Sequence, residues 1–228
     1  MYDWKKNTND PMDPTAHAEM SKYLLSRLFG YECSRIELIQ QFAANKKVLD
    51  IGAGEHDPKY FSENWEHQHI ASAAQHCTGL DLEQHLVDHY NSKGFNFICM
   101  DATSAENTGE QYDFIFCGDV IEHTNSPVDL VLFIKRHLKP GGSAILTTPN
   151  PFSNFMRKWQ SQTGHEFFQA NLEHTCWITA TTMNEICRRA KVSLHGIHLN
   201  KSVIDVRNKE AGFPIDLLIP EFVFEIRH

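Results

Sequence analysis

No segment of this 228-residue sequence is apolar over the roughly 18 to 20 residues that a membrane-spanning helix needs. The residues after Met1 also lack the apolar core of a secretory signal peptide. We therefore expect a chain without a membrane span, located in the cytoplasm. The composition, 41% hydrophobic and 22% charged, is that of a globular protein, and the length fits one domain.

Positive charge is scarce, because 21 Lys and Arg stand against 29 Asp and Glu, for a net charge of −8. Proteins that bind the phosphates of nucleic acids need clustered Lys and Arg. We therefore expect no nucleic acid among the partners. The sequence leaves the oligomeric state open, a dimer included.

Closely spaced cysteine pairs are absent, since none of the six cysteines forms a C-x-x-C motif. We therefore expect free thiols rather than a zinc motif or a disulfide framework. Histidine is abundant, with fourteen in the chain and four of them, His56, His67, His69 and His76, in one short stretch. Because no cysteine or carboxylate spacing completes a ligand set there, we interpret the stretch as a solvated polar insertion rather than a metal site.

Short apolar segments alternate with helical patterns along most of the chain. Strands are predicted over 48–51, 78–82, 95–100, 112–117, 143–148, 194–199 and 222–226. Helices are predicted over 15–29, 33–44, 83–91, 127–138 and 179–191. This alternation predicts an α/β, doubly wound, Rossmann-like sheet of seven mostly parallel strands, with helices on both faces. We expect residues 1–45 to form an N-terminal arm and helical cap, and residues 46–228 to form the main domain, with an aromatic lid segment at 151–177.

The first strand of the predicted sheet ends in a glycine turn, Asp50-Ile51-Gly52-Ala53-Gly54. Glycines at the carboxyl end of such a strand let a ligand approach the backbone closely. The nicotinamide fingerprint G-x-G-x-x-G would need a third glycine where this chain has Asp57. The acidic side chain of Asp50 suits a cationic ligand group better than a pyrophosphate. The turn therefore predicts a ligand with an α-amino group and no phosphates.

Further acidic residues follow the next three strands. Asp81 ends the second strand, where a carboxylate can accept hydrogen bonds from ribose hydroxyls. Asp101 follows the third strand, where it can accept from an adenine amino group or serve as an ordinary loop cap. Asp119, Glu122 and His123 follow the fourth strand. A histidine at this edge can act as a general base, or it can be a structural residue bonded to a backbone carbonyl.

Together, these motifs resemble the class I S-adenosylmethionine-dependent methyltransferases over about residues 46–191. Within that family they resemble the ubiquinone-biosynthesis O-methyltransferase type. The match rests on the glycine turn, Asp81, Asp101-Ala102, the segments 112–115 and 120–123, Leu138-Lys139-Pro140-Gly141-Gly142 and the segment 145–150. The resemblance implies S-adenosylmethionine as cofactor and methyl transfer to a small-molecule acceptor, most simply onto a hydroxyl oxygen. The cofactor-binding residues that it implies are Asp50, Gly52, Ala53, Gly54, Asp81, Leu82, Asp101, Ala102, Gly118 and Asp119.

The resemblance also implies catalytic roles for three residues. His123 is the expected base, with Asp119 or Glu122 orienting it. Some relatives place a divalent metal on an acid-x-x-Glu-His set, which here is Asp119, Glu122 and His123, joined by His174. We do not expect a metal in this chain.

Two alternatives to a small-molecule enzyme stay open. One is a metal-assisted 2′-O-methyltransferase acting on RNA, and the other is a non-catalytic member of the family that only binds the cofactor. Two departures from the family pattern bear on the second alternative. His56 stands where the family usually has another glycine, and residues 55–77 form a longer connection than usual.

Overall fold

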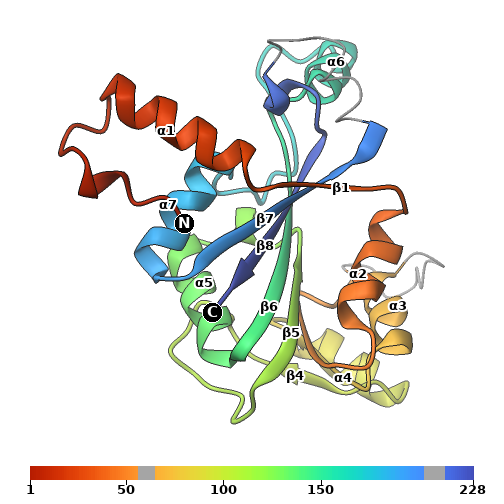
Figure 1. Ribbon diagram of the computed structural model, residues 1–228. Helices are drawn as coiled ribbons and strands as arrows, with labels where there is room; N and C mark the ends of the chain where they lie inside the picture. The colour runs from red at the N-terminus through yellow and green to blue at the C-terminus, as the bar shows by residue number, and fades with distance from the viewer. Residues whose placement is uncertain (56–64, 203–213) are drawn as a thin grey trace.

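In the computed structural model, which describes residues 1–55, 65–202 and 214–228, eight strands form one sheet. The strands are β1 (Leu28–Tyr31), β2 (Lys47–Ile51), β3 (His76–Asp81), β4 (Phe97–Cys99), β5 (Tyr112–Gly118), β6 (Leu138–Pro149), β7 (Ser193–Asn200) and β8 (Glu221–Arg227). Their order across the sheet is β1-β7-β8-β6-β5-β2-β3-β4 (Figure 1). β8 pairs antiparallel with both β6 and β7, and the other pairs are parallel. The Rossmann-like, mostly parallel α/β fold is confirmed, and all seven predicted strands are present.

Helices cover both faces of this sheet. The helices are α1 (Pro14–Leu25), α2 (Arg35–Ala43), α3 (Glu66–Ala73), α4 (Gln84–Ser92), α5 (Pro127–His137), α6 (Asn154–Thr163) and α7 (Ala180–Ala190), with short 3₁₀ turns η1 (Trp4–Lys6), η2 (Ile121–His123) and η3 (Ile215–Leu217). Figure 1 shows α5 and α7 on one side of the sheet and α2 and α3 on the other.

The two layers of core follow from the strand pleat, which points successive side chains to opposite faces. Ile115 and Leu146 belong to the large core cluster that includes residues of α5 and α7. Their neighbours Phe114 and Ile145 belong to the cluster that includes residues of α2. All four side chains are fully buried, so the central strands are apolar on both faces.

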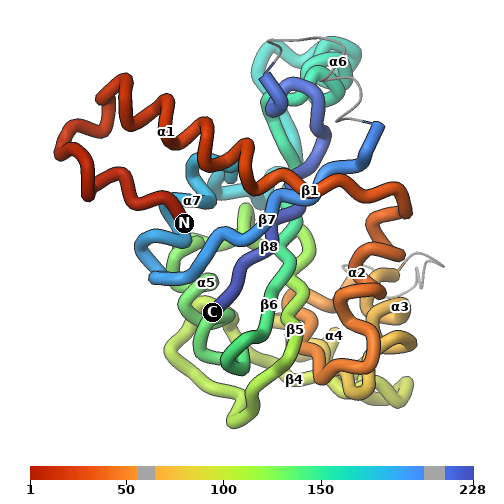
Figure 2. The backbone as a smooth tube through the Cα atoms, viewed as in Figure 1, coloured from red at the N-terminus to blue at the C-terminus, as the bar shows by residue number. Residues whose placement is uncertain are grey.

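The N-terminal region differs from the prediction at one point. The helix predicted over 15–29 begins after the cap residue Asp13, whose carboxylate accepts a hydrogen bond from the Ala16 amide at 2.8 Å, and it ends at Leu25. The residues that follow form β1, which pairs in parallel with β7 and adds an eighth strand at the sheet edge. Figure 2 shows the chain leaving α1, crossing the sheet edge as β1 and continuing into α2. The open edge of β7 offers backbone hydrogen bonds that outweigh the helical pattern of the apolar residues there.

Above the carboxyl edge of β6, helix α6 stands away from the sheet (Figure 1). None of its residues is buried, and the segment around it exposes large apolar side chains: Phe152, Phe155, Trp159, Phe167, Phe168 and Leu172. In the described parts of the chain, no helix combines the length and the apolar character needed to cross a membrane. All six cysteines are free thiols, as expected.

Candidate active site

A cavity of about 980 Å³ lies over the carboxyl ends of β2, β3, β4 and β5. Because the carboxyl ends of parallel strands meet at one edge of a sheet, residues far apart in the sequence come together there. The predicted site residues that line the cavity are Gly52, Gly54, Asp81, Leu82, Asp101, Ala102, Gly118, Asp119, Glu122, His123 and His174. Asp50 and Ala53 are not among the lining residues. His56 lies outside the residues that the structure describes.

The glycine turn is shaped by close contacts that leave no room for a side chain. Gly52 has a φ of +71°, and a Cβ there would lie 2.2 Å from Cγ2 of Val120. A Cβ on Gly54 would lie 2.7 Å from Oδ2 of Asp81 and 2.9 Å from Cδ1 of Leu86. The two glycines therefore bring the backbone of the turn against the end of β3 and against the loop that follows β5.

Asp81 is held in place by the backbone on either side of it. Its Oδ2 accepts a hydrogen bond from the Gly54 amide at 2.9 Å, and its Oδ1 accepts one from the Glu83 amide at 3.0 Å. Each carboxylate oxygen has a second lone pair. The carboxylate of Asp81 is therefore fixed at the cavity wall and still able to accept from the hydroxyls of a ligand.

Asp101 is exposed, and its side chain caps the loop in which it lies. Its Oδ1 accepts from both the amide and the hydroxyl of Thr103, each at 2.7 Å. This is the loop-cap arrangement that the sequence left open for this residue. Asp101 lines the cavity as well, so its second oxygen stands beside any ligand that reaches this end.

Asp50, the acidic residue of the glycine turn, is directed into the protein. Its side chain is 2% exposed, and its Oδ2 lies 2.8 Å from Nδ1 of His67, which is also 2% exposed. Burial raises the pKa of Asp50, and the hydrogen bond from His67 acts against that rise. The neighbouring Ala53 accepts a hydrogen bond at its carbonyl from Nε1 of Trp65, at 2.8 Å. The interpretation of the histidine-rich stretch as solvated is therefore wrong for His67, which is a buried partner of the motif.

Three side chains, Glu122, His123 and His174, converge at the other end of the cavity. One ligand atom from each lies within 4.8 Å of the other two. The rings of His123 and His174 meet edge to face with centroids 4.7 Å apart. His174 reaches this position because Thr175 is tied to the loop after β5: its amide donates to the Glu122 carbonyl at 2.9 Å and its hydroxyl to the Thr124 carbonyl at 2.8 Å.

Two polar atoms of this cluster are buried without hydrogen-bond partners among the described residues. Oε2 of Glu122 and Nδ1 of His174 make no hydrogen bond to any described residue. Burial raises the pKa of Glu122 to about 7, and the nearby charge of Asp119 acts in the same direction. Burial lowers the pKa of His174, and so does His123. Buried polar groups without partners mark a place where a ligand or ion would supply the missing contacts.

His123 is not oriented in the way the resemblance implied. In the described part of the chain, no hydrogen bond joins it to Asp119 or to Glu122. Its Nδ1 lies 3.9 Å from Oε2 of Glu173, which is an ion-pair distance but too long for a hydrogen bond. Asp119, which has a φ of +52°, instead contacts Thr147 and the guanidinium of Arg35.

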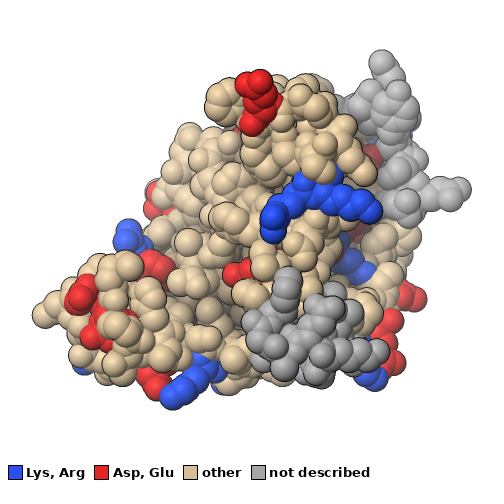
Figure 3. All heavy atoms as spheres, turned by 90° about the horizontal axis from the view of Figure 1, so that it is seen from above, with Lys and Arg blue, Asp and Glu red and all other residues tan. Residues whose placement is uncertain are grey.

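Negative charge dominates the cavity. Its lining residues include eight acids, namely Glu55, Asp81, Glu83, Asp101, Asp119, Glu122, Glu173 and Glu221, and no Lys or Arg among those described. Seen from above in Figure 3, Lys and Arg are scattered among uncharged atoms rather than gathered in one broad patch. A ligand with several phosphates would meet repulsion in this cavity, and a ligand with net positive charge would be attracted.

Sequence reasoning missed two residues that organise the site. Arg35, on α2, forms ion pairs with Glu66, Asp119 and Glu221 and so ties the cavity rim to α2 and α3. His67 was noted only as one of a cluster of histidines. Neither residue carries a local sequence signal, because its role depends on partners that lie 17 to 186 positions away.

Comparison with known proteins adds three results. The sequence model of the methyltransferase domain family matches residues 24–192. Ubiquinone biosynthesis O-methyltransferase from Hydrogenovibrio crunogenus is 29% identical over 126 residues, which are 51% of this chain and 48% of that protein. The enzyme of the same name from Aromatoleum aromaticum is 26% identical over 160 residues, 64% of each chain. This chain thus spans about half to two thirds of the length of these curated relatives.

Solved structures agree on the fold. An S-adenosylmethionine-dependent methyltransferase from Clostridium acetobutylicum superposes with a TM-score of 0.56 at 10% identity, covering 93% of this chain and 98% of that one. One from Mesorhizobium loti gives a TM-score of 0.54 at 14% identity, covering 85% of this chain and 95% of that one.

Proposed function

Because this chain belongs to the methyltransferase domain family, we propose that it transfers a methyl group from S-adenosylmethionine to a hydroxyl oxygen of a small molecule. The observation that carries the proposal is the acid-rich cavity, which has no Lys or Arg among its described lining residues. S-adenosylmethionine has a sulfonium and an ammonium group against one carboxylate and no phosphates, so it carries net positive charge. The cavity therefore suits this cofactor and disfavours nicotinamide dinucleotides and RNA, which carry phosphates.

The residues at one end of the cavity would hold the cofactor. The Asp81 carboxylate would accept hydrogen bonds from the ribose hydroxyls, as acidic residues do at this position of Rossmann-like sheets. Gly52 and Gly54 would leave their backbone open to the methionine part, and Asp101 and Ala102 would border the adenine. The Gly118–Asp119 backbone would complete the wall, with Arg35 holding the Asp119 side chain.

The residues at the other end would act on the acceptor. S-adenosylmethionine, when bound, supplies a methyl group that its sulfonium sulfur activates. The His123 imidazole would take the proton from the acceptor hydroxyl, and Glu173 would stabilise the resulting imidazolium from 3.9 Å. Phe155 and Met156 of α6 border this end and would exclude water from the acceptor. A hydroxyl acceptor is supported by the likeness to ubiquinone biosynthesis O-methyltransferases.

Calorimetric titration with S-adenosylmethionine, S-adenosylhomocysteine and NADH tests the cofactor. We expect binding of the first two and none of NADH. Asp81→Asn should remove binding, while Asp88→Asn, an exposed carboxylate on α4, should leave the affinity unchanged within about twofold. Binding of NADH, or full affinity in the Asp81 variant, would contradict the cofactor assignment.

Radiolabelled methyl transfer to a panel of catechols, alcohols, amines and short RNA tests the acceptor class. We expect product with a hydroxyl-bearing small molecule. Methylated product formed only from amines, or only from RNA, would contradict the assignment of a small-molecule hydroxyl as the acceptor. Cofactor binding without product from any acceptor would favour a non-catalytic member of the family.

A second way to activate the hydroxyl is favoured by the unpartnered atoms of Glu122 and His174. With His123 these residues offer three ligands of the types that hold divalent transition metals. A cation held there would lower the pKa of a coordinated hydroxyl. Dialysis against a chelator separates the two routes: activity that survives it supports His123 as the base, and activity restored only by added metal supports the metal route.

A further inference from the structure

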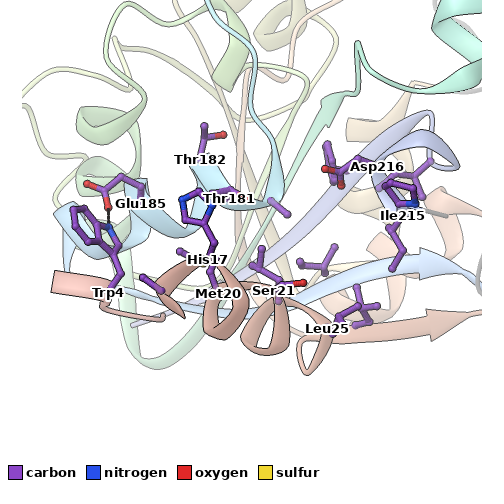
Figure 4. A pocket seen from close by; sticks show the side chains of 18 of the residues that line it. Trp4, His17, Met20, Ser21, Leu25, Thr181, Thr182, Glu185, Ile215 and Asp216 are labelled. Carbon is purple, nitrogen blue, oxygen red and sulfur yellow. Dashed lines mark hydrogen bonds between the residues drawn. The ribbon is translucent and has the colours of Figure 1, made fainter. Parts of the chain in front are cut away.

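A second cavity, of about 880 Å³, lies apart from the cofactor cavity, between α1, the start of α7 and the segment that leads into β8. Most of its wall is apolar, with Met20, Leu24, Leu25, Ile197, Ile219 and Phe222 among the lining residues. Figure 4 shows Trp4 and Glu185 at one end, Ile215 and Asp216 at the other, and side chains of α1 along the wall between them. The cavity is therefore an elongated apolar space with polar groups at its two ends.

The polar groups at the Trp4 end are already paired. Glu185 accepts hydrogen bonds from Arg188 and Arg189, each at 2.8 Å, and from Nε1 of Trp4 at 3.2 Å. These contacts neutralise Glu185 and also occupy Arg189, the one Lys or Arg among the described lining residues. His17, on α1, is bonded through Nε2 to the Pro11 carbonyl at 2.9 Å.

Asp216, at the opposite end of the cavity, differs from Glu185 in the partners of its carboxylate. Its carboxylate makes no hydrogen bond and no ion pair with any residue in the described ranges. Burial raises the pKa of Asp216, and none of the described residues supplies a cation that acts against that rise. Asp216 is half-buried at the cavity wall, so a cation that reached its carboxylate would form a charge-assisted hydrogen bond there.

The wall that carries Asp216 is firmly held and separates the two cavities. Asn150, fully buried at the end of β6, donates through its side chain to the carbonyls of Asp216 and Ile219, at 2.6 and 2.8 Å. Ile219 and Phe222 line the second cavity, whereas Pro220 and Glu221 line the cofactor cavity. Adjacent residues of one segment thus face two different spaces.

We propose that the second cavity binds an amphiphilic small molecule with an aliphatic chain and a cationic amino group. The amino group lies at Asp216, and the chain extends along α1 towards Trp4. The volume is of the size that small-molecule sites have, and an apolar lining with a few polar groups, here Asp216 among the described residues, is their usual composition. The site is separate from the cofactor cavity and does not depend on the methyltransferase assignment.

Calorimetric titration with decylamine, decanol and decanoate, each below its micellar concentration, tests the proposal. The three probes share one chain and differ only at the head group. We expect decylamine to bind about tenfold more tightly than decanol, and decanoate to bind more weakly still. Equal affinity for the three probes, or no binding of decylamine, would overturn the proposal.

Substitutions in the second cavity test whether decylamine binds there. Asp216→Asn should reduce the preference for decylamine over decanol to within about twofold. Ser21→Phe, which fills the cavity from an exposed position on α1, should abolish binding of decylamine and decanol. Ala18→Phe is the matched control, because Ala18 is exposed on the same helix and does not line the cavity. Equal binding by the Ser21 and Ala18 variants would overturn the assignment.

The acid-rich cofactor cavity is the competing location for a cationic probe. Saturation with S-adenosylhomocysteine should leave the affinity for decylamine unchanged within about twofold if the two sites are separate. Displacement of decylamine would place it in the cofactor cavity and contradict the proposal. Tryptophan fluorescence gives a second readout: decylamine should change it in the unmodified protein and not in Trp4→Phe, and the shorter probe methylamine should change neither.

Discussion

Nδ1 of His67 lies 2.8 Å from Oδ2 of Asp50, and both side chains are almost completely buried. Asp50 belongs to the glycine turn that begins the cofactor motif, and His67 belongs to α3. The pair therefore joins the first strand of the motif to the helix that follows it. In this chain the acidic residue of the turn supports the proposed cofactor site through packing and hydrogen bonding rather than by lining the cavity.

Removal of one member of this pair should destabilise the fold. His67→Ala would leave the Asp50 carboxylate buried without its partner, and we expect the free energy of unfolding to fall by about 3 kcal/mol. Urea denaturation at neutral pH measures the change. Gln68→Ala, an exposed neighbour on the same helix, should change stability by less than about 0.5 kcal/mol. A stable His67 variant would show that the pair is not a structural contact.

Gly54 should tolerate no side chain. In Gly54→Ala the new Cβ would lie 2.7 Å from Oδ2 of Asp81, the atom that the Gly54 amide now holds. We expect the affinity for S-adenosylhomocysteine to fall by about tenfold or more, measured by calorimetry. Gly109→Ala is the control, because no atom lies within 4 Å of its added Cβ, so its only penalty is backbone strain at a φ of +78°. It should lose stability and keep cofactor affinity. Equal affinities in the two variants would argue against the role of Gly54.

His123 should affect turnover more than cofactor binding. His123→Ala would remove the proposed base, and we expect kcat to fall by roughly 100-fold or more, while the affinity for S-adenosylhomocysteine stays within about threefold. Steady-state kinetics and calorimetry give the two quantities. His85→Ala, an exposed histidine on α4, should change neither. Normal kcat in the His123 variant would eliminate this residue as the base.

Glu122 should make stability depend on pH. Its pKa rises from 4.5 in the unfolded chain to about 7 in the fold, so the folded state favours the protonated carboxyl group. The stabilisation is complete below pH 4.5 and is lost as the pH rises through about 7, which amounts to about 3 kcal/mol. Relative to Glu122→Gln, the unmodified protein should therefore become steadily less stable between about pH 4.5 and 7, and the difference should level off above pH 7.

Urea denaturation of both proteins across this pH range measures the difference. Glu106→Gln, at an exposed site, is the control and should differ from the unmodified protein by the same amount at every pH. A constant difference for Glu122→Gln would mean that its carboxyl group ionises normally in the fold.

The sequence alone determined seven of the eight strands and most of the helices. The runs 114–117 and 144–146 are apolar without interruption, and only a strand covered on both faces buries such runs completely. The glycine turn and the acids after three strands also predicted that these residues meet at one edge of the sheet, because parallel strands bring their carboxyl ends together. Both predictions rest on local sequence patterns, because strand geometry alone determines which faces are buried and where the strand ends meet.

Tertiary structure decided the features that depend on distant partners. Leu28 and Phe29 continue a helical pattern in the sequence but belong to β1, which pairs with β7, because an open strand edge supplies hydrogen bonds that no local pattern records. In the sequence, Asp50 has the position of a ligand-binding acid. In the fold, its carboxylate is buried and hydrogen-bonded to His67. His174 joins Glu122 and His123 only because Thr175 is bonded to the loop after β5. Each of these three features depends on residues that only folding brings together. The sequence therefore predicted which edge of the sheet carries the polar residues, and tertiary packing decided which of their side chains face the cavity.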